Sequence, residues 1–220
     1  MTPAFSLLLA TSNRGKLAEL TALLADLPIE VMSLAAALPG RPQAVEDGAT
    51  LEDNARIKAR AAASAAVMVT IGEDSGLEVD ALGGRPGVRS ARFASEGATD
   101  AENNAALLAA LDEVDGDQRA ARFRTVMVLI DPWAEGELKE LVVEGRCEGT
   151  IARAPSGTGG FGYDPLFVVT SAGRTMAELT EAEKNQVSHR AQAFAALRPA
   201  LEDLVFRRVA QAARIAGDRS

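Results

Sequence analysis

Apolar residues recur along the chain with two different spacings. Mainly apolar segments of strand length occupy residues 5–10, 67–71 and 122–130, and such segments are typical of β-strands. Elsewhere leucine and alanine recur every three or four positions, which is the spacing of one helix face. On this basis we expect helices over residues 17–27, 51–66, 101–114 and from Ser188 to about 203. Strands and helices alternate without a repeat or a linker, so the pattern predicts an α/β domain.

Shorter apolar segments complete the expected set of strands, at residues 29–31, 77–79, 138–143 and 166–169. The segments 122–130 and 138–143 follow each other closely and predict a pair of strands. We therefore expect a mixed central sheet flanked by helices. Residues 1–203 should form a single domain, and the arginine- and alanine-rich residues 204–220 should form a basic C-terminal tail.

Composition and charge narrow the classes of partner. The chain has 220 residues, enough for one domain with a sizeable core, and a formal net charge of -8. Nucleic acid and anionic membranes require a broad basic surface, so we expect neither as a partner. With one cysteine and one histidine, the chain can form neither an internal disulfide nor a Cys/His zinc site. No apolar run is long enough to span a membrane, and we expect a cytoplasmic protein.

Lysine is rare in this arginine-rich chain and occurs only at positions 16, 58, 139 and 184. A retained lysine indicates weakly that a compact ammonium group is needed. Lys16 ends a polar loop, residues 11–16, between the first expected strand and the first expected helix. Backbone N–H groups and the positive helix end at such a junction bind anions. The segment is not a Walker A loop, because Ala10 and Leu17 replace the glycine and the hydroxyl residue. An ordinary strand–helix loop is the alternative interpretation.

A capping-box-like pair, Thr50 and Asp53, starts the helix expected at residue 51. On that helix Asn54 and Lys58 are four residues apart and therefore share one face. Glu46 lies shortly before the helix. These residues can contribute to a site, although a solvated helix face is the alternative interpretation.

Two adjacent carboxylates, Glu73 and Asp74, follow the apolar run at residues 67–71. Ligands of α/β sheets usually bind where strands end, and unpaired charges at the end of a buried strand are costly. Carboxylate oxygens suit Mg²⁺, which accompanies polyphosphate substrates, and a carboxylate can orient or deprotonate a water molecule. The sequence therefore favours a functional site here over an exposed acidic turn.

Residues 157–165 form a glycine-rich segment that presents Phe161, Tyr163 and Asp164. Its G-x-G-x-x-G spacing is not a dinucleotide fingerprint, because Pro165 leads into a strand and no βαβ unit surrounds the segment. Aromatic rings can stack on a base while backbone groups and a carboxylate read its edge. We expect this loop to bind a base.

The single histidine lies close to another of the rare lysines. Lys184 shortly precedes Ser188, His189 and Arg190. This grouping indicates base or phosphate binding, and a buried histidine at a helix start is the alternative. A serine-hydrolase triad has little support, since the chain contains no G-x-S-x-G segment.

Taken together, these segments resemble the inosine triphosphate pyrophosphatase family, whose members hydrolyse nonstandard purine nucleoside triphosphates. The matching segments follow the family's order over nearly the whole chain, at residues 10–16, 45–48, 54–59, 73–77, 82–87, 90–93, 157–165 and 183–190. The resemblance implies a mixed sheet in two lobes with the nucleotide in the cleft between them, and usually a homodimer. It also implies Mg²⁺-dependent hydrolysis of ITP, dITP and XTP to the monophosphate and pyrophosphate, which cleanses the nucleotide pool.

The family's motifs also imply a role for each matching residue. By that match Asp74 is the catalytic carboxylate, and Glu46, Asp74 and Glu73 are the magnesium ligands. The residues expected to bind substrate are Thr11, Ser12, Asn13, Arg14, Gly15, Lys16, Asn54, Lys58, Ser75, Phe161, Gly162, Tyr163, Asp164, Lys184, His189 and Arg190. The loop at 11–16 and Lys58 would hold the triphosphate, and the residues from 161 onward would hold and read the base. Arg14 occupies a position that varies in the family.

Two other functions remain open. A related enzyme of similar fold would hydrolyse modified pyrimidine or methylated nucleoside triphosphates. A module without catalytic activity would bind nucleotides and release no pyrophosphate, which the presence of both Glu46 and Asp74 disfavours.

Overall fold

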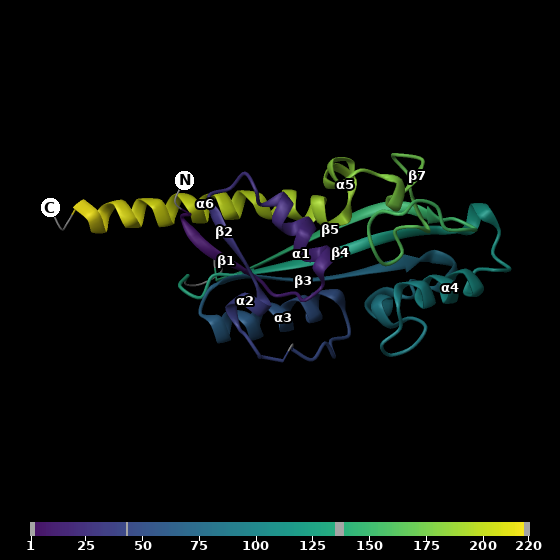
Figure 1. Cartoon of the computed structure of the whole chain (residues 1–220), viewed down its shortest axis with the longest axis horizontal. Coiled ribbons are helices and arrows are strands. Elements are labelled where there is room, and N and C mark those ends of the chain that lie inside the picture. Colours follow the sequence, from purple (N-terminus) through teal and green to yellow (C-terminus); the bar gives the residue numbers. More distant parts are fainter. Residues whose placement is uncertain (1–2, 43, 135–138, 218–220) are drawn as a thin grey trace.

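A twisted sheet runs through the whole molecule (Figure 1). The protein is described here from a computed structural model, which covers residues 3–42, 44–134 and 139–217. In these residues seven strands lie in the order β2-β1-β3-β4-β5-β6-β7. Their bounds are β1 Phe5–Leu9, β2 Ile29–Ser33, β3 Val69–Val79, β4 Ala120–Ile130, β5 Glu140–Ile151, β6 Phe167–Val169 and β7 Arg174–Thr175. β1 is parallel to β2 and β3, and the remaining pairs are antiparallel. The predicted mixed sheet is therefore confirmed.

Helices cover both faces of this sheet. In Figure 1, α1 (Arg14–Leu23) and α6 (His189–Gly217) lie above it, and α3 (Leu51–Ala66) lies below. The other helical segments are α2 (Leu34–Ala37), α4 (Asp100–Ala110) and α5 (Glu181–Val187), with short 3₁₀ turns η1 (Asp80–Leu82), η2 (Gly87–Arg92), η3 (Gly116–Gln118) and η5 (Met176–Glu178). Among the described helices, none has the length and apolar composition that crossing a membrane requires.

The start of α3 follows from local sequence. The backbone N–H of Asp53 donates to Thr50 Oγ1 (3.1 Å), and the backbone N–H of Thr50 donates to Asp53 Oδ2 (3.1 Å). These bonds satisfy donors that every helix start leaves open. The predicted capping box and both predicted ends of this helix are confirmed.

One long strand replaces the two strands expected at residues 67–71 and 77–79. β3 pairs with β4 without interruption from Thr70↔Ile130 to Val79↔Ala121. Glu73 and Asp74 therefore lie in the middle of a strand, and the expectation that they follow its end was wrong. Because successive side chains of a strand point to opposite faces, the carboxylates of Glu73 and Asp74 lie on opposite sides of the sheet.

Two glycines let helices approach the sheet closely at this point. A Cβ at Gly72 would lie 2.3 Å from the carbonyl oxygen of Ala55 on α3, and one at Gly145 would lie 2.2 Å from that of His189 on α6. No side chain fits at either position, since real Cβ atoms do not approach backbone so closely. The glycines thus set the depth at which α3 and α6 present their polar residues to β3.

Other differences concern short or terminal elements. The sequence pattern indicated neither α2 nor β7, which have only four and two residues. The helix expected from Ser188 is present, and its apolar face is buried at Ala193, Leu197 and Leu201. α6 continues past residue 203 to Gly217, so the expected boundary of the 204–220 tail lies inside a helix whose far end projects from the molecule (Figure 1). Residues 138 and 218–220 lie outside the described parts.

Two lobes share the three longest strands. The first lobe surrounds a core in which α1 and α6 pack on one face, with a second core beneath α3. The second lobe surrounds a core of α4, β6 and the far halves of β3 and β4, with Leu77, Leu107, Phe123 and Phe167 at its centre. The predicted two-lobed arrangement is present, and the polar motifs lie where the lobes meet.

Candidate active site

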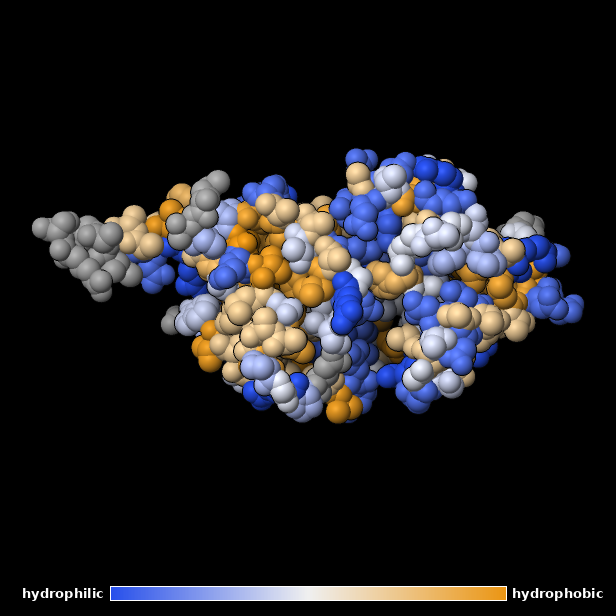
Figure 2. Space-filling view, viewed as in Figure 1, coloured by the Kyte–Doolittle hydropathy of each residue, from blue (hydrophilic) through white to orange (hydrophobic). Residues whose placement is uncertain are grey.

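The cleft between the lobes begins where β1 ends. β1 pairs with β3 from Leu7↔Val69 to Leu9↔Ile71, after which the chain turns away into α1. β3 continues to Val79, and in the described residues no strand follows along that edge. A cavity of about 290 Å³ opens there and is lined by residues of both lobes. Figure 2 shows the surface hollowed between the two lobes, with polar residues around the hollow.

A polar loop from β1 to α1 forms one wall of the cavity. Asn13 caps α1 by accepting from the backbone N–H of Lys16 (3.0 Å), and Thr11 Oγ1 accepts from the backbone N–H of Asn13 (3.2 Å). Ser12 also lines the cavity. The predicted geometry of a helix start facing a cavity is therefore present, and it offers backbone N–H groups and one ammonium to an anion.

Two residues of the same loop do not line the cavity. Arg14 is exposed at the first position of α1, outside the cavity wall. Gly15 packs against the ring of Phe161, and a Cβ there would lie 2.4 Å from that ring. The glycine therefore lets the loop touch the glycine-rich segment of the second lobe.

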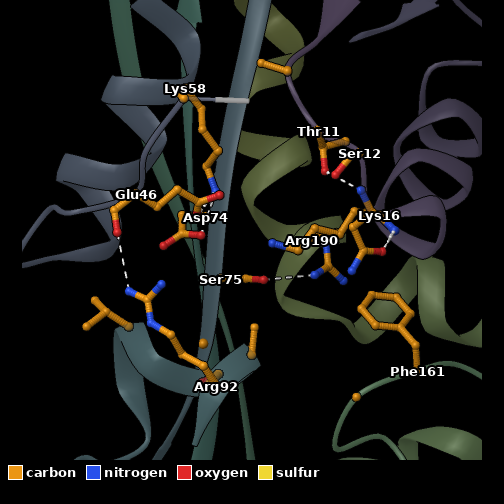
Figure 3. A pocket seen from close by; sticks show the side chains of 18 of the residues that line it. Thr11, Ser12, Lys16, Glu46, Lys58, Asp74, Ser75, Arg92, Phe161 and Arg190 are labelled. Atoms are coloured by element: carbon orange, nitrogen blue, oxygen red, sulfur yellow. Dashed lines mark hydrogen bonds and ion pairs between the residues drawn. The ribbon is translucent and has the colours of Figure 1, made fainter. Parts of the chain in front are cut away.

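An acidic end of the cavity is built from Glu46, Lys58 and Asp74 (Figure 3). Lys58 Nζ donates to Asp74 Oδ1 at 2.7 Å and to Glu46 Oε2 at 3.0 Å. Burial raises the pKa of Asp74 above its ordinary value, against the opposing charge of Lys58. Burial also lowers the pKa of Lys58, but the two carboxylates outweigh this and raise it. An ammonium thus keeps two carboxylates together beside the open cavity.

Asn54 supports this end from behind. Its side chain is buried, donates to Asp74 Oδ2 (3.4 Å) and accepts from the backbone N–H of Gly48 (2.8 Å). It does not line the cavity. The structure thus places Asn54 as a support of Asp74 and of the loop that carries Glu46, instead of facing the cavity where substrate would bind.

A buried ion-pair network lies at the other end, and we use that name for Lys16, Glu19, Glu73, Asp164, Lys184 and Arg190. Glu73 is 1% exposed and does not line the cavity. Its Oε2 lies 3.0 Å from Lys16 Nζ, and its Oε1 accepts from Arg190 Nε (3.2 Å) and from Thr125 Oγ1 (2.6 Å). Burial alone would raise the pKa of Glu73, but Lys16 and Arg190 hold it well below its ordinary value. Among the described residues, Glu73 therefore pairs with Lys16 and Arg190 and does not face the cavity.

Glu19 completes this network, and sequence reasoning missed it. It lies on α1, is 7% exposed, and accepts from Lys184 Nζ (2.8 Å) and Arg190 Nη1 (2.7 Å). The sequence held one signal, since Glu19 adjoins Leu20 on the apolar face of the predicted helix and lies three residues after Lys16. An acid on a buried face requires a cationic partner.

Lys184 is held away from the cavity surface. Besides Glu19, its ammonium donates to Asp164 Oδ2 at 2.9 Å, and it does not line the cavity. Burial lowers its pKa, but Asp164 and Glu19 outweigh that effect and raise it. Lys184 thus acts on the cavity through Asp164, whose carboxylate also accepts from the backbone N–H of Phe161 (3.1 Å).

The two rings of the glycine-rich loop differ in position. Phe161 lines the cavity, and Lys184 Nζ and Arg190 Cζ lie 5.7 and 5.2 Å from its ring centre. Tyr163 is 4% exposed within the core of the second lobe, and its hydroxyl donates to the carbonyl oxygen of Ser90 (2.8 Å). Tyr163 also lines the cavity, but its burial in this core and its bond to Ser90 make it an anchor of the loop. Gly162 lines the cavity beside them.

Arg190 and His189 face the cavity from the start of α6. Arg190 Nη2 donates to Ser75 Oγ at 3.0 Å, so three sides of the guanidinium are fixed. His189 is 4% exposed, stacks on Phe123 with ring centres 4.8 Å apart, and its Nδ1 has no partner among the described residues. Burial, and then the charge of Arg190, hold the pKa of His189 well below its ordinary value. The histidine is therefore neutral and forms no hydrogen bond to a serine in the described parts, as a hydrolase triad would need.

Comparisons with known proteins agree with this geometry. The model of the Ham1 family matches residues 7–200. A dITP/XTP pyrophosphatase of Geobacillus kaustophilus is 48% identical over 199 residues, which are 90% of this chain and 95% of that protein. One of Escherichia coli (strain K12) is 46% identical over 89% of this chain and 97% of that protein.

Solved structures resemble the chain over a similar length. A HAM1 protein from Coxiella burnetii matches with a TM-score of 0.79 and 42% identity, covering 90% of this chain and 99% of that one. A nucleoside-triphosphatase / dITP/XTP pyrophosphatase from Mycobacterium abscessus matches with a TM-score of 0.68 and 46% identity, covering 88% and 99%. The resemblance indicated by the sequence motifs is confirmed.

Proposed function

The chain belongs to the Ham1 family, and from that premise we propose that it hydrolyses ITP, dITP and XTP to the nucleoside monophosphate and pyrophosphate. The observation that carries the proposal is that one cavity has two chemically different ends. Carboxylates and Lys58 lie at one end, and an aromatic ring with Arg190 and His189 lies at the other. A nucleotide has the same division, with phosphates at one end and a base at the other.

Asp74 is the group that prepares the attacking water. It lines the cavity, and its burial raises its pKa, which strengthens a carboxylate as a base. The water oxygen forms a bond to the α-phosphorus, its proton passes to Asp74, and the bond from that phosphorus to the β-phosphate oxygen breaks. Pyrophosphate leaves with the electrons of that bond. Lys58, Lys16 and the backbone of the 11–16 loop stabilise the charge on the phosphates.

The acidic end also suits Mg²⁺. Glu46 and Asp74 offer hard oxygen atoms beside the cavity, separated by the single ammonium of Lys58. In the described residues no three acidic, histidine or cysteine side chains gather as a closed metal site, which fits an ion that binds through one or two carboxylates and substrate phosphates. When bound, Mg²⁺ would neutralise charge on the phosphate oxygens. Glu73 is paired with two cations instead.

Preference for a 6-oxo purine follows from fixed donors near Phe161. Arg190 uses one N–H each for Glu73, Glu19 and Ser75, and a guanidinium has five. The remaining N–H groups can donate to a 6-oxo group, whereas the amino group of adenine would leave a buried donor unpaired. Each such mismatch costs about 1–3 kcal/mol. Hypoxanthine and xanthine are accordingly favoured over adenine.

The wider role follows from the same activity. Hydrolysis of these triphosphates would keep them out of DNA and RNA. The enzyme would act in the cytoplasm and as a homodimer. The relatives' names support the activity, and the net charge of -8 is compatible with a single bound nucleotide but unfavourable for nucleic acid.

The decisive experiment incubates the purified protein with ITP, dITP, XTP, ATP and GTP in the presence of Mg²⁺ and separates the products by chromatography. We expect monophosphate and pyrophosphate from the first three. Diphosphate and orthophosphate would contradict the proposal. Turnover of modified pyrimidine or methylated triphosphates in preference to ITP would favour the related enzyme, and binding without pyrophosphate release would favour a nonenzymatic module.

A further inference from the structure

Arg92 brings a guanidinium from the second lobe into the cavity (Figure 3). Its Nη2 donates to the backbone carbonyl oxygen of Glu46 at 3.3 Å. Across Figure 3, from right to left, lie Phe161, Arg190, Ser75 and Asp74. Arg92 and Glu46 lie at the left, on the side of Asp74. Arg92 therefore lies at the acidic end, opposite the ring that would hold the base.

The guanidinium of Arg92 is poorly satisfied. Its Nε is buried and has no hydrogen-bond partner among the described residues. Glu96 Oε1 lies 3.7 Å from that nitrogen, beyond hydrogen-bond distance, and the side chain of Glu96 is 73% exposed. A pair of this kind contributes little to stability. The bond to Glu46 is thus the one hydrogen bond that the guanidinium makes within the described parts of the chain.

The backbone on both sides of Arg92 is held firmly. Asn103 of α4 is 3% exposed, donates to the carbonyl oxygen of Ala91 (3.2 Å) and accepts from the backbone N–H of Ala94 (3.0 Å). Ser90 accepts from the backbone N–H of Leu77 on β3 at 2.8 Å. The second lobe thus fixes the residue whose side chain crosses toward the first lobe. Such fixed positioning lowers the entropic cost of binding a ligand.

We propose that Arg92 binds the β- and γ-phosphates of the substrate and holds pyrophosphate as it leaves. The proposal rests on the function proposed above. When the bond from the α-phosphorus to the bridging oxygen breaks, negative charge develops on pyrophosphate, and a guanidinium can pair with two of its oxygens at once. The long bond to the Glu46 carbonyl is exchanged for these contacts. Arg92 is then the second lobe's counterpart of Lys58. Residues 90–93 are among the segments that match the family, but no role for Arg92 followed from that match.

The test compares Arg92→Ala and Arg92→Lys with Arg89→Ala. Arg89 lies on the same turn, also contacts Glu96 (3.1 Å), and does not line the cavity. We would measure inhibition of ITP hydrolysis by pyrophosphate and by IMP, and the binding of pyrophosphate with Mg²⁺ by calorimetry. We expect Arg92→Ala to weaken pyrophosphate binding and to lower kcat/KM at least tenfold, with IMP binding changed less than twofold. Arg92→Lys should recover part of the affinity, since it keeps the charge but not the two-pronged geometry.

Two outcomes would overturn the inference. Unchanged pyrophosphate binding by Arg92→Ala would show that the guanidinium does not hold the leaving group, and equal weakening of pyrophosphate and IMP would assign Arg92 to the structure of the cleft. Thermal unfolding shows whether each variant folds, and Arg92→Lys carries the test if Arg92→Ala does not. Calorimetry does not require turnover, so a wild-type protein that hydrolyses no ITP would contradict the proposed function separately from this inference.

Discussion

The two ends of the cavity hold their charges in different ways. In the buried ion-pair network three carboxylates face three cations, and no side chain of the six is more than 14% exposed. At the acidic end Glu46 and Asp74 share one lysine, and the Glu46 side chain is 34% exposed. Every charge of the network is paired before any ligand binds, whereas at the acidic end Glu46 is partly exposed and Arg92 has no carboxylate within hydrogen-bond distance among the described residues. The network suits recognition of an uncharged base beside Phe161 and Arg190. The acidic end, together with the one network lysine that lines the cavity, Lys16, suits Mg²⁺ with phosphates.

This difference sets what substitutions should do. Breaking a buried ion pair by removing one partner leaves an uncompensated charge and costs about 3–5 kcal/mol of stability. A partly exposed carboxylate is solvated when its partner is lost, so the stability cost is small. Changes in the network should therefore act on folding, and changes at the acidic end should act on chemistry.

The largest expected effect is on turnover by Asp74→Asn. A carboxylate acting as a general base contributes about 10²–10⁴-fold, so we expect kcat for ITP to fall about 10³-fold. Asp74 is buried, but the amide keeps the shape of its side chain and Lys58 keeps Glu46 as a partner at 3.0 Å. The free energy of unfolding in urea should therefore change by about 1 kcal/mol or less. Asp112→Asn, at an exposed position, is the control and should leave both quantities unchanged. Near-normal turnover by Asp74→Asn would show that another group activates the water.

Glu73→Gln is expected to act on folding. It removes the carboxylate that pairs with Lys16 and Arg190, and the loss should be about 3 kcal/mol of unfolding free energy in urea. Binding of Mg²⁺ or Mn²⁺ by calorimetry should change less than twofold. The reverse result, with stability kept and metal affinity lost, would restore Glu73 as a magnesium ligand and remove the contrast between the two ends.

Glu46→Gln is the matched change at the acidic end. We expect the Mg²⁺ concentration for half-maximal rate to rise about tenfold, which corresponds to about 1.4 kcal/mol. The free energy of unfolding should stay within about 0.5 kcal/mol of the wild-type value, since this carboxylate is partly exposed. A stability loss as large as that of Glu73→Gln would show that both ends are equally structural.

The smallest expected effect is the pH dependence caused by His189, the single histidine. Its pKa in the folded protein lies well below the ordinary 6.5, because it is buried beside Arg190. Below pH 6.5 the unfolded chain therefore binds one more proton than the folded protein, and stability falls as pH falls. Between pH 7.5 and 5.5 the loss from this group is at most about 1.4 kcal/mol, the limit set by protonation of the unfolded chain.

His189→Gln should remove that part of the pH dependence. The measurement is the free energy of unfolding in urea at both pH values for the wild type and the variant. An identical pH dependence in the two proteins would show that His189 titrates alike in the folded protein and the unfolded chain, which would contradict the expected effect of its burial beside Arg190.

Local chemistry accounts for what the sequence could predict. The Thr50–Asp53 capping box and both ends of α3 depend on residues next to one another. The course of β3 does not, since glycines and carboxylates at residues 72–76 are typical of a turn and are kept in a strand by pairing with β4. A single sequence does not show that pairing, and the two expected strands are the result.

The site shows the same division. Motifs brought many of the polar and charged residues of the cavity to notice, because their types and spacing carry chemistry. Glu19 escaped, since its partner Arg190 is 171 positions away in the chain. The surroundings of Glu73 escaped for a related reason. Side chains alternate between the two faces of a strand, but the sequence alone does not show which helices cover each face.

Three unbroken strands pass from one lobe into the other. β3 contributes Ile71 to the first-lobe core and Leu77 to the second, β4 contributes Met127 and Phe123 in the same way, and β5 also runs between them. Neither lobe can lose its fold while the other keeps these strands intact, so denaturation should proceed as one cooperative transition. A cavity-forming substitution at Leu107, which is buried in the second-lobe core and does not line the cavity, would thereby lower the thermal midpoint of the whole molecule and the lifetime of its active site.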